Sequence, residues 1–482
     1  MVQYTVEIIE KEAVMSIKKF IGDRAFYRMV LGVSVPIMIQ QGITNLVNLL
    51  DNIMVGRLGT ESMSGVSIVN QFIFIFNLLI FGAISAAGIF TAQYHGLGDV
   101  EGERSTFRLK MIINLLAGAA GVAVFALFDD AFISLFLFAG SAEGDLALTL
   151  SEGKIYLRCM LVGMIPYAIS QVYASTMRET GETVMPMIAS VSAVSANFVL
   201  NYILIFGKLG APAMGVEGAA LATVISRFVE LAVLAVWGHT HAEKCPYLVG
   251  AYRSLAVPQS LVGRVIVKGL PLMLNEVLWA IAMMLRNQCY STRGLDVVAA
   301  QNISSTIFNV FSVVYMALGS SIAIVVGGLL GAGKLDEARD TDRKMMTFSV
   351  LCAVGMGLLL SAVSGIFPRI YETSDTARHM ATYMIAVSAA TMPFAAFAHS
   401  SYFTLRSGGR VAVTLLFDSV YMWVVVMPVC FVLSRFTDMN IYLLFAICQG
   451  VDVIKAFFGY ALLRRGTWVR QLVGQEEKTG EV

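Results

Sequence analysis

Long apolar runs recur along the whole chain, separated by short polar segments. A helix needs about 20 apolar residues to cross a bilayer core of roughly 30 Å, because backbone groups find no water there. Runs of this length predict twelve spans and therefore an all-α integral membrane protein. They lie at residues 30–54, 64–93, 109–128, 155–177, 185–206, 214–238, 264–288, 299–330, 345–368, 379–405, 411–434 and 440–463.

The composition agrees with a lipid environment and excludes several classes of function. Of the 482 residues, 57% are hydrophobic and 14% are charged, whereas about 25% are charged in soluble domains. The 34 basic and 33 acidic residues give a net charge of +1, which leaves no basic face for a phosphate backbone. We therefore expect membrane lipid, and no nucleic acid, as a partner.

No enzyme motif stands out in the predicted spans. They contain no HExxH, no GxSxG and no paired histidines for a metal, so we do not expect an enzyme. The segment 328–334, GLLGAGK, has the glycine and lysine spacing of a phosphate loop, but Leu335 stands where Ser or Thr is needed. ATP and other cofactors are therefore not expected. The six cysteines show no CxxC spacing and imply no disulfide framework.

The chain repeats itself in its second half. A shift of 235 residues aligns Pro36 with Pro271, and Gly59 with Gly294. Because each half holds six spans, the halves have the same orientation and form a parallel repeat. We expect five segments. These are a cytoplasmic N-terminal segment (1–28), an N-lobe with spans 1–6 (29–238), a cytoplasmic linker (239–263), a C-lobe with spans 7–12 (264–465) and a cytoplasmic tail (466–482).

Lysine and arginine set the expected orientation. An even number of spans puts both termini on one side, and the basic loops, including those with Arg104, Arg108 and Lys244, lie on that side. We therefore predict a multi-pass protein of the plasma (inner) membrane with both termini in the cytoplasm.

Two carboxylates within the spans are the candidates for ion or proton coupling. An intramembrane carboxylate is costly, and it is expected to face a cavity or a partner, where it can exchange a proton or bind Na⁺. Asp51 follows the mostly apolar stretch 43–50, although a headgroup-level pair with Arg57 is the alternative. Glu276 lies deep in the seventh span and is the repeat mate of Gln41, although it could instead be a protonated structural carboxyl.

Other polar residues in the spans are candidates for a substrate or ion cavity. Asp418 lies near Trp423, where an organic cation could bind, or it forms an interhelical hydrogen bond. Asn197 and Asn201 are four residues apart, so both amides share one helix face, either around a cavity or as contacts between helices. His399 could titrate near neutral pH or could simply pack.

Two pairs of opposite charges are expected to be structural. Arg227 and Glu230 are three residues apart in the sixth span, and Asp452 and Lys455 repeat this spacing in the twelfth with the signs exchanged. Each pair can neutralise itself on one face of its own helix.

Over residues 28–465 the chain resembles the multidrug and toxic compound extrusion (MATE) family of secondary transporters, in its bacterial NorM-like branch. The resemblance rests on LLDNIMVGRLG around Asp51, GLPLMLNEVLWA around Glu276, and NYILIFGKLGAPAMGVEGAALAT from Asn201. It implies two pseudo-symmetric six-helix lobes around a central cavity. The chain departs from that branch at Ala395, where an aspartate is expected, and Asp418 is a candidate for the missing role.

The resemblance also implies a mechanism. We expect an antiporter that exports small amphipathic, often cationic, drugs or metabolites in exchange for Na⁺ or H⁺ by alternating access. Na⁺ would bind at Asp51 or Glu276, and the protein would be a monomer. The alternative is a lipid-linked oligosaccharide flippase of the same superfamily, which should need a basic cavity. Arg286 is the deep arginine without a partner on its own helix.

Overall fold

The computed structural model describes residues 19–139, 146–371 and 373–474, and these residues form helices joined by turns. Twelve of the described helical segments are long and apolar enough to cross a membrane, as predicted. The first six spans are α2 (Arg24–Gly56), α3 (Thr60–Leu97), α4 (Val100–Leu127), α6 (Leu146–Glu179), α7 (Val184–Phe206) and α8 (Gly215–Thr240). The next four are α9 (Gln259–Ser291), α10 (Leu295–Gly331), α11 (Leu335–Val363) and α12 (Asp375–Ser407). The last two are Val411–Phe436 and α15 (Ile441–Arg464).

The eleventh span is a composite of four segments. It begins as α13 (Val411–Leu415), continues through the wider π-helical turns η4 (Leu416–Val420) and η5 (Met422–Val426), and ends as α14 (Met427–Phe436). Pro428 near the start of α14 has no N–H for the preceding turn. Such π-helical turns are frequent at functional sites, and η4 contains Asp418.

Short helices were not among the predicted elements. A helix of eleven residues, α5 (Asp129–Ala139), follows α4 in a region predicted to be loop. Within the predicted linker, η1 (Pro246–Leu248) and η2 (Ala251–Arg253) pack against α4, and η3 (Phe367–Ile370) follows α11. Arg108 of α4 fixes the linker, because its guanidinium donates to the carbonyls of Ala251 (2.8 Å) and Gly250 (3.2 Å).

The chain divides into two compact units. Among the described residues, unit 1 contains 19–38, 92–98, 274–371 and 373–474, and unit 2 contains 39–91, 99–139 and 146–273. The boundaries between these two units fall within α2 and α9 and around the end of α3, and not at the predicted linker. The two units therefore do not test the predicted limits of the N-lobe and the C-lobe, which stay a prediction. The predicted terminal segments, 1–28 and 466–482, lie partly outside the described residues.

The internal repeat is visible in the helix boundaries and in the backbone. The bounds of α9 are those of α2 moved by 235 residues, and each helix contains the aligned proline, Pro36 or Pro271. Gly59 and its mate Gly294 have φ angles of 122° and 115°. Gly98 and Gly333 have φ angles of 78° and 73° after α3 and α10. Only glycine adopts such angles without strain, so the matched glycines encode matched turns.

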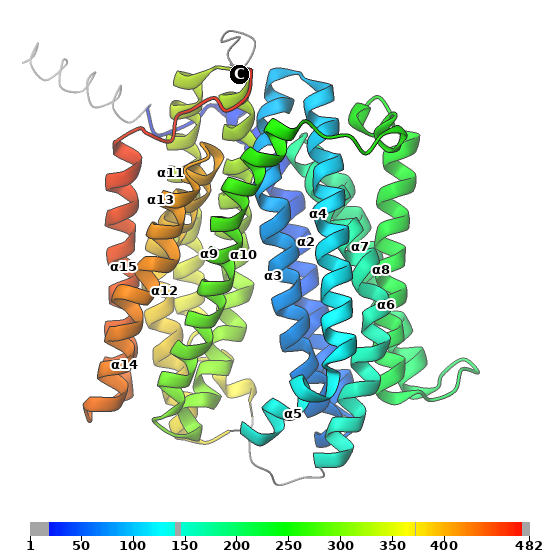
Figure 1. The fold of residues 1–482 in the computed structure, drawn as a ribbon. Coiled ribbons are helices and arrows are strands. Elements are labelled where there is room, and N and C mark those ends of the chain that lie inside the picture. Colours follow the sequence, from blue (N-terminus) through cyan, green and yellow to red (C-terminus); the bar gives the residue numbers. More distant parts are fainter. Residues whose placement is uncertain (1–18, 140–145, 372, 475–482) are drawn as a thin grey trace, which may run out of the picture. The chain divides into compact units, whose positions relative to one another are not determined.

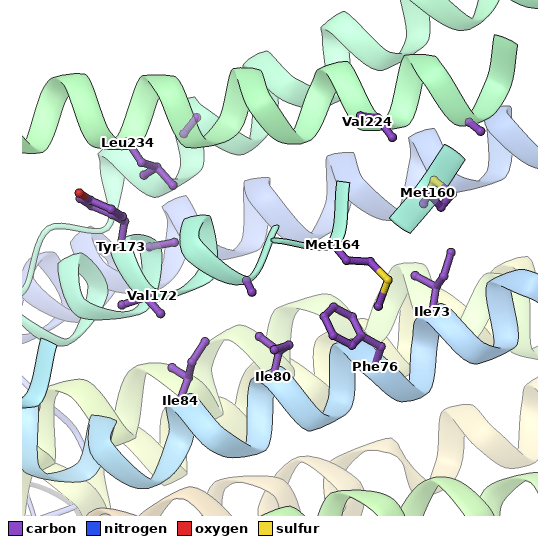
Figure 2. Packing of buried hydrophobic residues seen from close by; sticks show 14 of the residues in the cluster. Ile73, Phe76, Ile80, Ile84, Met160, Met164, Val172, Tyr173, Val224 and Leu234 are labelled. Atoms are coloured by element: carbon purple, nitrogen blue, oxygen red, sulfur yellow. The ribbon is translucent and has the colours of Figure 1, made fainter. Parts of the chain in front are cut away.

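In unit 2, α6 and α8 pack side by side, and α3 completes the core (Figure 1). Figure 2 shows Phe76 and Ile80 of α3 directed toward Met164 of α6, with Val224 and Leu234 on α8. Small residues let these helices approach closely. A Cβ atom on Gly65 of α3 would lie 2.7 Å from the Thr149 carbonyl of α6.

In unit 1, α12 packs against α10, α11 and α15 and forms the centre of the bundle (Figure 1). Its buried side chains include polar ones, and Ser400, Ser401 and Thr404 are fully buried. Thr404 donates to the buried carboxylate of Asp342 on α11 at 2.5 Å. The core of this unit therefore contains polar side chains at several positions along α12. A helix bundle in lipid with a purely structural role does not require them.

Candidate functional site

Asp51, near the C-terminal end of α2, lies against two amides of α7 in unit 2. Asn201 Nδ2 donates to Asp51 Oδ1 at 2.7 Å. In the amide orientation that pairs donors with acceptors, Asn197 Nδ2 lies 3.0 and 2.9 Å from the two carboxylate oxygens. The spacing of four residues places both amides on one face of α7, as predicted, and the structure directs that face to Asp51.

A hydroxyl extends this cluster toward α8. The other atom of the Asn197 amide lies 3.2 Å from Thr223 Oγ1, and Asn201 Oδ1 is buried without a hydrogen-bond partner. No ion pair to Asp51 is present in the part of the chain that the structure describes, so the alternative pair with Arg57 is not formed there. The Asp51 carboxylate therefore accepts hydrogen bonds from neutral amides, and the unpartnered Asn201 Oδ1 lies in the same cluster.

Thr223 also lines a pocket within unit 2. Its other walls include Phe76, Asn77, Met160, Met164, Tyr167 and Arg227. The Arg227 guanidinium lies 4.4 Å from the centre of the Tyr167 ring. Arg227 also forms an ion pair with Glu230 at 3.7 Å, so the predicted contact between Arg227 and Glu230 is confirmed. Contacts through Thr223 and Asn197 thus connect this pocket to Asp51.

Glu276 lies on α9 in unit 1, where it faces α12. Tyr402 Oη donates to Glu276 Oε1 at 2.8 Å, and Tyr402 is itself 8% exposed. Arg406 is buried one turn further along α12 and stacks over Phe403. Glu276 therefore has a neutral hydrogen-bond donor and no ion pair among the described residues, which resembles the setting of Asp51.

Asp418 differs from these two carboxylates because it is neutralised. Lys455 of α15 forms an ion pair with it, and Asn275 Nδ2 of α9 donates to it at 2.9 Å. The expectation that an organic cation pairs with Asp418 is therefore not supported, since a lysine already occupies that position. The interhelical hydrogen bond that was the alternative is present.

The predicted pair of Asp452 and Lys455 is wrong. Asp452 Oδ2 instead accepts from Arg286 Nη1 of α9 at 2.7 Å, while Lys455 pairs with Asp418. The spacing of three residues permits a pair within α15, but partners on neighbouring helices leave both charges better neutralised in a low-dielectric core. Arg286, which lacked a partner in the sequence analysis, has one.

The remaining candidates lie on α12 (His399), the eleventh span (Trp423) and α2 (Gln41). His399 packs edge-on against Tyr315 and Phe403, with ring centres 5.8 and 5.0 Å away. Trp423 Nε1 donates to the Leu278 carbonyl at 3.0 Å. Gln41 is half-buried on α2, next to Gln40, which accepts from Arg178 at 3.4 Å.

Sequence reasoning missed the residues that hold the carboxylates. Thr223, Asn275 and Tyr402 lie within spans, and each contacts a carboxylate or its amide partner. Asn275 was detectable because it precedes Glu276, but the partners on other helices carry no local signal. Lys110 of α4 is also fully buried and pairs with Glu179 of α6. Metal-binding groups of His, Cys, Asp and Glu are absent from the described part of the chain.

Twelve membrane-capable helices, an internal parallel repeat and the Glu276 carboxylate held within a span define a multi-pass helical membrane transporter. The sequence profile of the MatE family matches residues 36–203 and 271–432. The chain therefore belongs to the multidrug and toxic compound extrusion (MATE) family.

Known relatives resemble the chain over most of its length. "Probable multidrug resistance protein NorM" of Thermotoga maritima is 24% identical over 452 residues, which are 93% of this chain and 94% of that protein. "Multidrug resistance protein PmpM" of Pseudomonas aeruginosa is 26% identical over 324 residues, covering 66% and 65%. The structure of a multidrug resistance MATE family transporter in an outward-facing conformation matches with a TM-score of 0.81, at 19% identity, and covers 94% and 97%. This structural similarity shows that the two chains share a fold.

Proposed function

We propose that the protein is a secondary active antiporter that exports small amphipathic, often cationic, compounds in exchange for Na⁺ or H⁺. The observation that carries this proposal is the Asp51 carboxylate, which neutral amides hold at 2.7–3.0 Å within a membrane helix. An unpaired carboxylate in a transmembrane helix is costly, and it is retained where an ion or proton must bind.

The contrast between the four carboxylates supports this choice. Asp418 and Asp452 each have a lysine or arginine partner, and these fixed ion pairs suit a structural role. Asp51 and Glu276 have only neutral donors among the described residues. A carboxylate that forms no ion pair can be neutralised by a transported cation, so these two are the proposed coupling residues.

The chemistry around Asp51 suits either coupling ion. Na⁺ takes oxygen ligands, and the cluster offers the two carboxylate oxygens, the unpartnered Asn201 Oδ1 and the Thr223 hydroxyl. A proton would instead bind one carboxylate oxygen directly. His399, Gln41 and Trp423 are proposed to line the transport pathway without carrying the coupled charge.

The residues that line the pocket next to this cluster suit a promiscuous substrate site. Flexible methionine side chains and aromatic rings adapt to different apolar shapes, and Met160, Met164, Phe76 and Tyr167 line it. Relatives named as multidrug resistance proteins agree with such a site. Because Thr223 belongs both to the pocket and to the Asp51 cluster, a substrate there would disturb the groups that bind the ion.

Antiport follows if substrate and ion bind in mutually exclusive ways. A ligand shifts a conformational equilibrium only through its different affinities for the two states. Ion binding at Asp51 or Glu276 would release the substrate outward and allow the return to the inward-open state. We further propose a monomer in the plasma (inner) membrane, surrounded by lipid, with both termini in the cytoplasm and with no requirement for ATP or a cofactor.

The flippase alternative is not favoured. It required a basic cavity, and the arginine that suggested one, Arg286, is neutralised by Asp452. The family match and the relatives named for drug resistance also agree with export of small molecules.

Efflux of ethidium from cells tests the proposal, with Na⁺ and pH gradients imposed separately. We expect efflux to follow one gradient and to fall at least tenfold in Asp51→Asn. We expect Glu276→Gln to impair ion-driven efflux as well. Asp336→Asn is the matched control, because Asp336 has a 97% exposed side chain at the start of α11.

Full gradient-driven efflux in both Asp51→Asn and Glu276→Gln would refute the coupling role. No efflux of any tested cation under either gradient, with the protein present in the membrane, would refute drug export itself. Loss of efflux in Asp336→Asn to the same extent would show that the assay reports expression and not coupling.

A further inference from the structure

Two cysteine side chains lie side by side in the core of unit 1. Cys430 of α14 and Cys448 of α15 have their sulfur atoms 2.9 Å apart, and neither residue is exposed. The two helices pack against each other in this unit. No pattern in the sequence predicts this contact, since 18 residues separate the two positions and no short cysteine motif is present.

This contact distinguishes the pair from the other four cysteines. Cys159 and Cys352 are partly exposed, while Cys245 is buried beside Tyr247. Cys289 is buried in the same hydrophobic cluster as the pair, and it is therefore the competing thiol in any reaction there. Within the residues that the structure describes, no other contact between two cysteine sulfurs is present.

The separation fits a disulfide better than a metal site. A disulfide joins sulfurs at about 2.05 Å, so the two atoms need to move by less than about 1 Å. A tetrahedral metal with sulfur bonds of about 2.3 Å would hold two sulfurs roughly 3.8 Å apart. The described residues also supply no group of three His, Cys, Asp or Glu side chains for such a metal.

We propose that Cys430 and Cys448 are a reversible oxidation site that closes to a disulfide when local opening of the hairpin between α14 and α15 lets a peroxide reach the two buried thiols. One sulfur attacks the peroxide and becomes a sulfenic acid as the O–O bond breaks, which releases one water molecule. The second sulfur then attacks the sulfenic sulfur, and a second water leaves. The two thiols are oxidised by two electrons and one hydrogen peroxide is reduced to two waters.

The bond would join α14 to α15 and fix the hairpin between them. That hairpin contains the turn after Phe436 and the cap at Asn440, whose side chain accepts from the Tyr442 amide at 3.1 Å. Arg286 and Asp452 pair beside the thiols and connect α9 to α15. Oxidation would therefore restrict sliding of α14 against α15 in unit 1, independently of the coupling proposed at Asp51 and Glu276.

Peptide mapping of the full-length protein in detergent tests the proposal. Trypsin cleaves after Arg410, Arg435 and Lys455, so the two cysteines fall in separate peptides, 411–435 and 436–455. Reduced protein is treated with hydrogen peroxide, alkylated and digested without reductant. We expect one cross-linked species of these two peptides, about 2 Da lighter than their sum because two hydrogens leave, and its loss after reduction.

Variants identify the sulfurs. Cys430→Ser and Cys448→Ser should each abolish the cross-link, while Cys289→Ser, the matched control from the same cluster, should retain it. Cys289 falls in peptide 287–293, so a cross-link to that peptide in the wild type would overturn the proposal. Sulfinic or sulfonic acid on 411–435 without any cross-link would also overturn it, as would unmodified thiols under peroxide that oxidises a control dithiol.

Discussion

Arg286 Nη1 donates to Asp452 Oδ2 over 2.7 Å, so a cation of α9 and an anion of α15 neutralise each other inside unit 1. The two side chains are 11% and 30% exposed. Both charges would be costly alone in this environment. The pair therefore restrains how α9 and α15 pack, and its disruption should be measurable as lost stability.

We predict that Asp452→Asn destabilises the protein by about 2 kcal/mol, because it leaves the Arg286 guanidinium without its countercharge. The figure is below the usual range for a fully buried pair, since Asp452 is partly exposed. Thermal unfolding in detergent measures the effect. The double variant Arg286→Met with Asp452→Asn should recover much of the loss, and Asp375→Asn, an 87% exposed carboxylate, is the control. Equal melting temperatures for wild type and Asp452→Asn would contradict this account.

We predict that Asn201→Ala lowers ion-driven efflux about tenfold without reducing the amount of protein in the membrane. The amide holds Asp51 at 2.7 Å, and a hydrogen bond to a charged group contributes about 1.5–3 kcal/mol, which is tenfold or more in an equilibrium. Transport of ethidium with measured expression checks this. Asn309→Ala removes an exposed amide from α10 and should leave efflux unchanged. Unaltered transport in Asn201→Ala would mean that the amide does not position the carboxylate.

We predict that Gly98→Ala and Gly333→Ala each cost about 1 kcal/mol of stability, because an L side chain at these positive φ angles clashes with its own backbone. No atom lies within 4 Å of a Cβ on Gly98, so the cost there comes from conformation alone. Unfolding measurements on both variants give the comparison. Gly263→Ala, in open space on α9, should be neutral or slightly stabilising. A large difference between the two variants would show that the repeated turns are not energetically equivalent.

We predict that Cys245, which lies between α8 and η1, reacts slowly with a maleimide in the folded protein. Burial raises the pKa of the Cys245 thiol, and its side chain is 0% exposed. The neutral thiol is favoured in the fold, so this group stabilises the protein at neutral pH and loses that contribution as pH rises through the folded pKa. Labelling of a variant that retains only Cys245 should therefore accelerate at alkaline pH and after denaturation. Fast labelling of the folded protein at neutral pH would contradict the burial.

The twelve spans and the repeat could be predicted because they depend on local patterns. An apolar run of sufficient length forms a helix in lipid whatever surrounds it, since its backbone must satisfy itself. Glycines such as Gly59 and Gly294 mark turns through their own φ angles. The composite eleventh span and the short helix α5 were not predicted, because a π turn and a helix of eleven residues leave little trace in hydrophobicity.

The sequence by itself indicated that Glu276, Asp418 and Asp452 lie within membrane spans, but only the tertiary structure decided the partners of these residues and of Asp51. Lys455 could reach Asp452 on its own helix, yet it pairs with Asp418, while Asp452 pairs with Arg286. The sequence could not resolve this, because the rotation and depth of one helix against another depend on the packing of all their side chains together. The contact between the Cys430 and Cys448 sulfurs depends on the tertiary structure for the same reason.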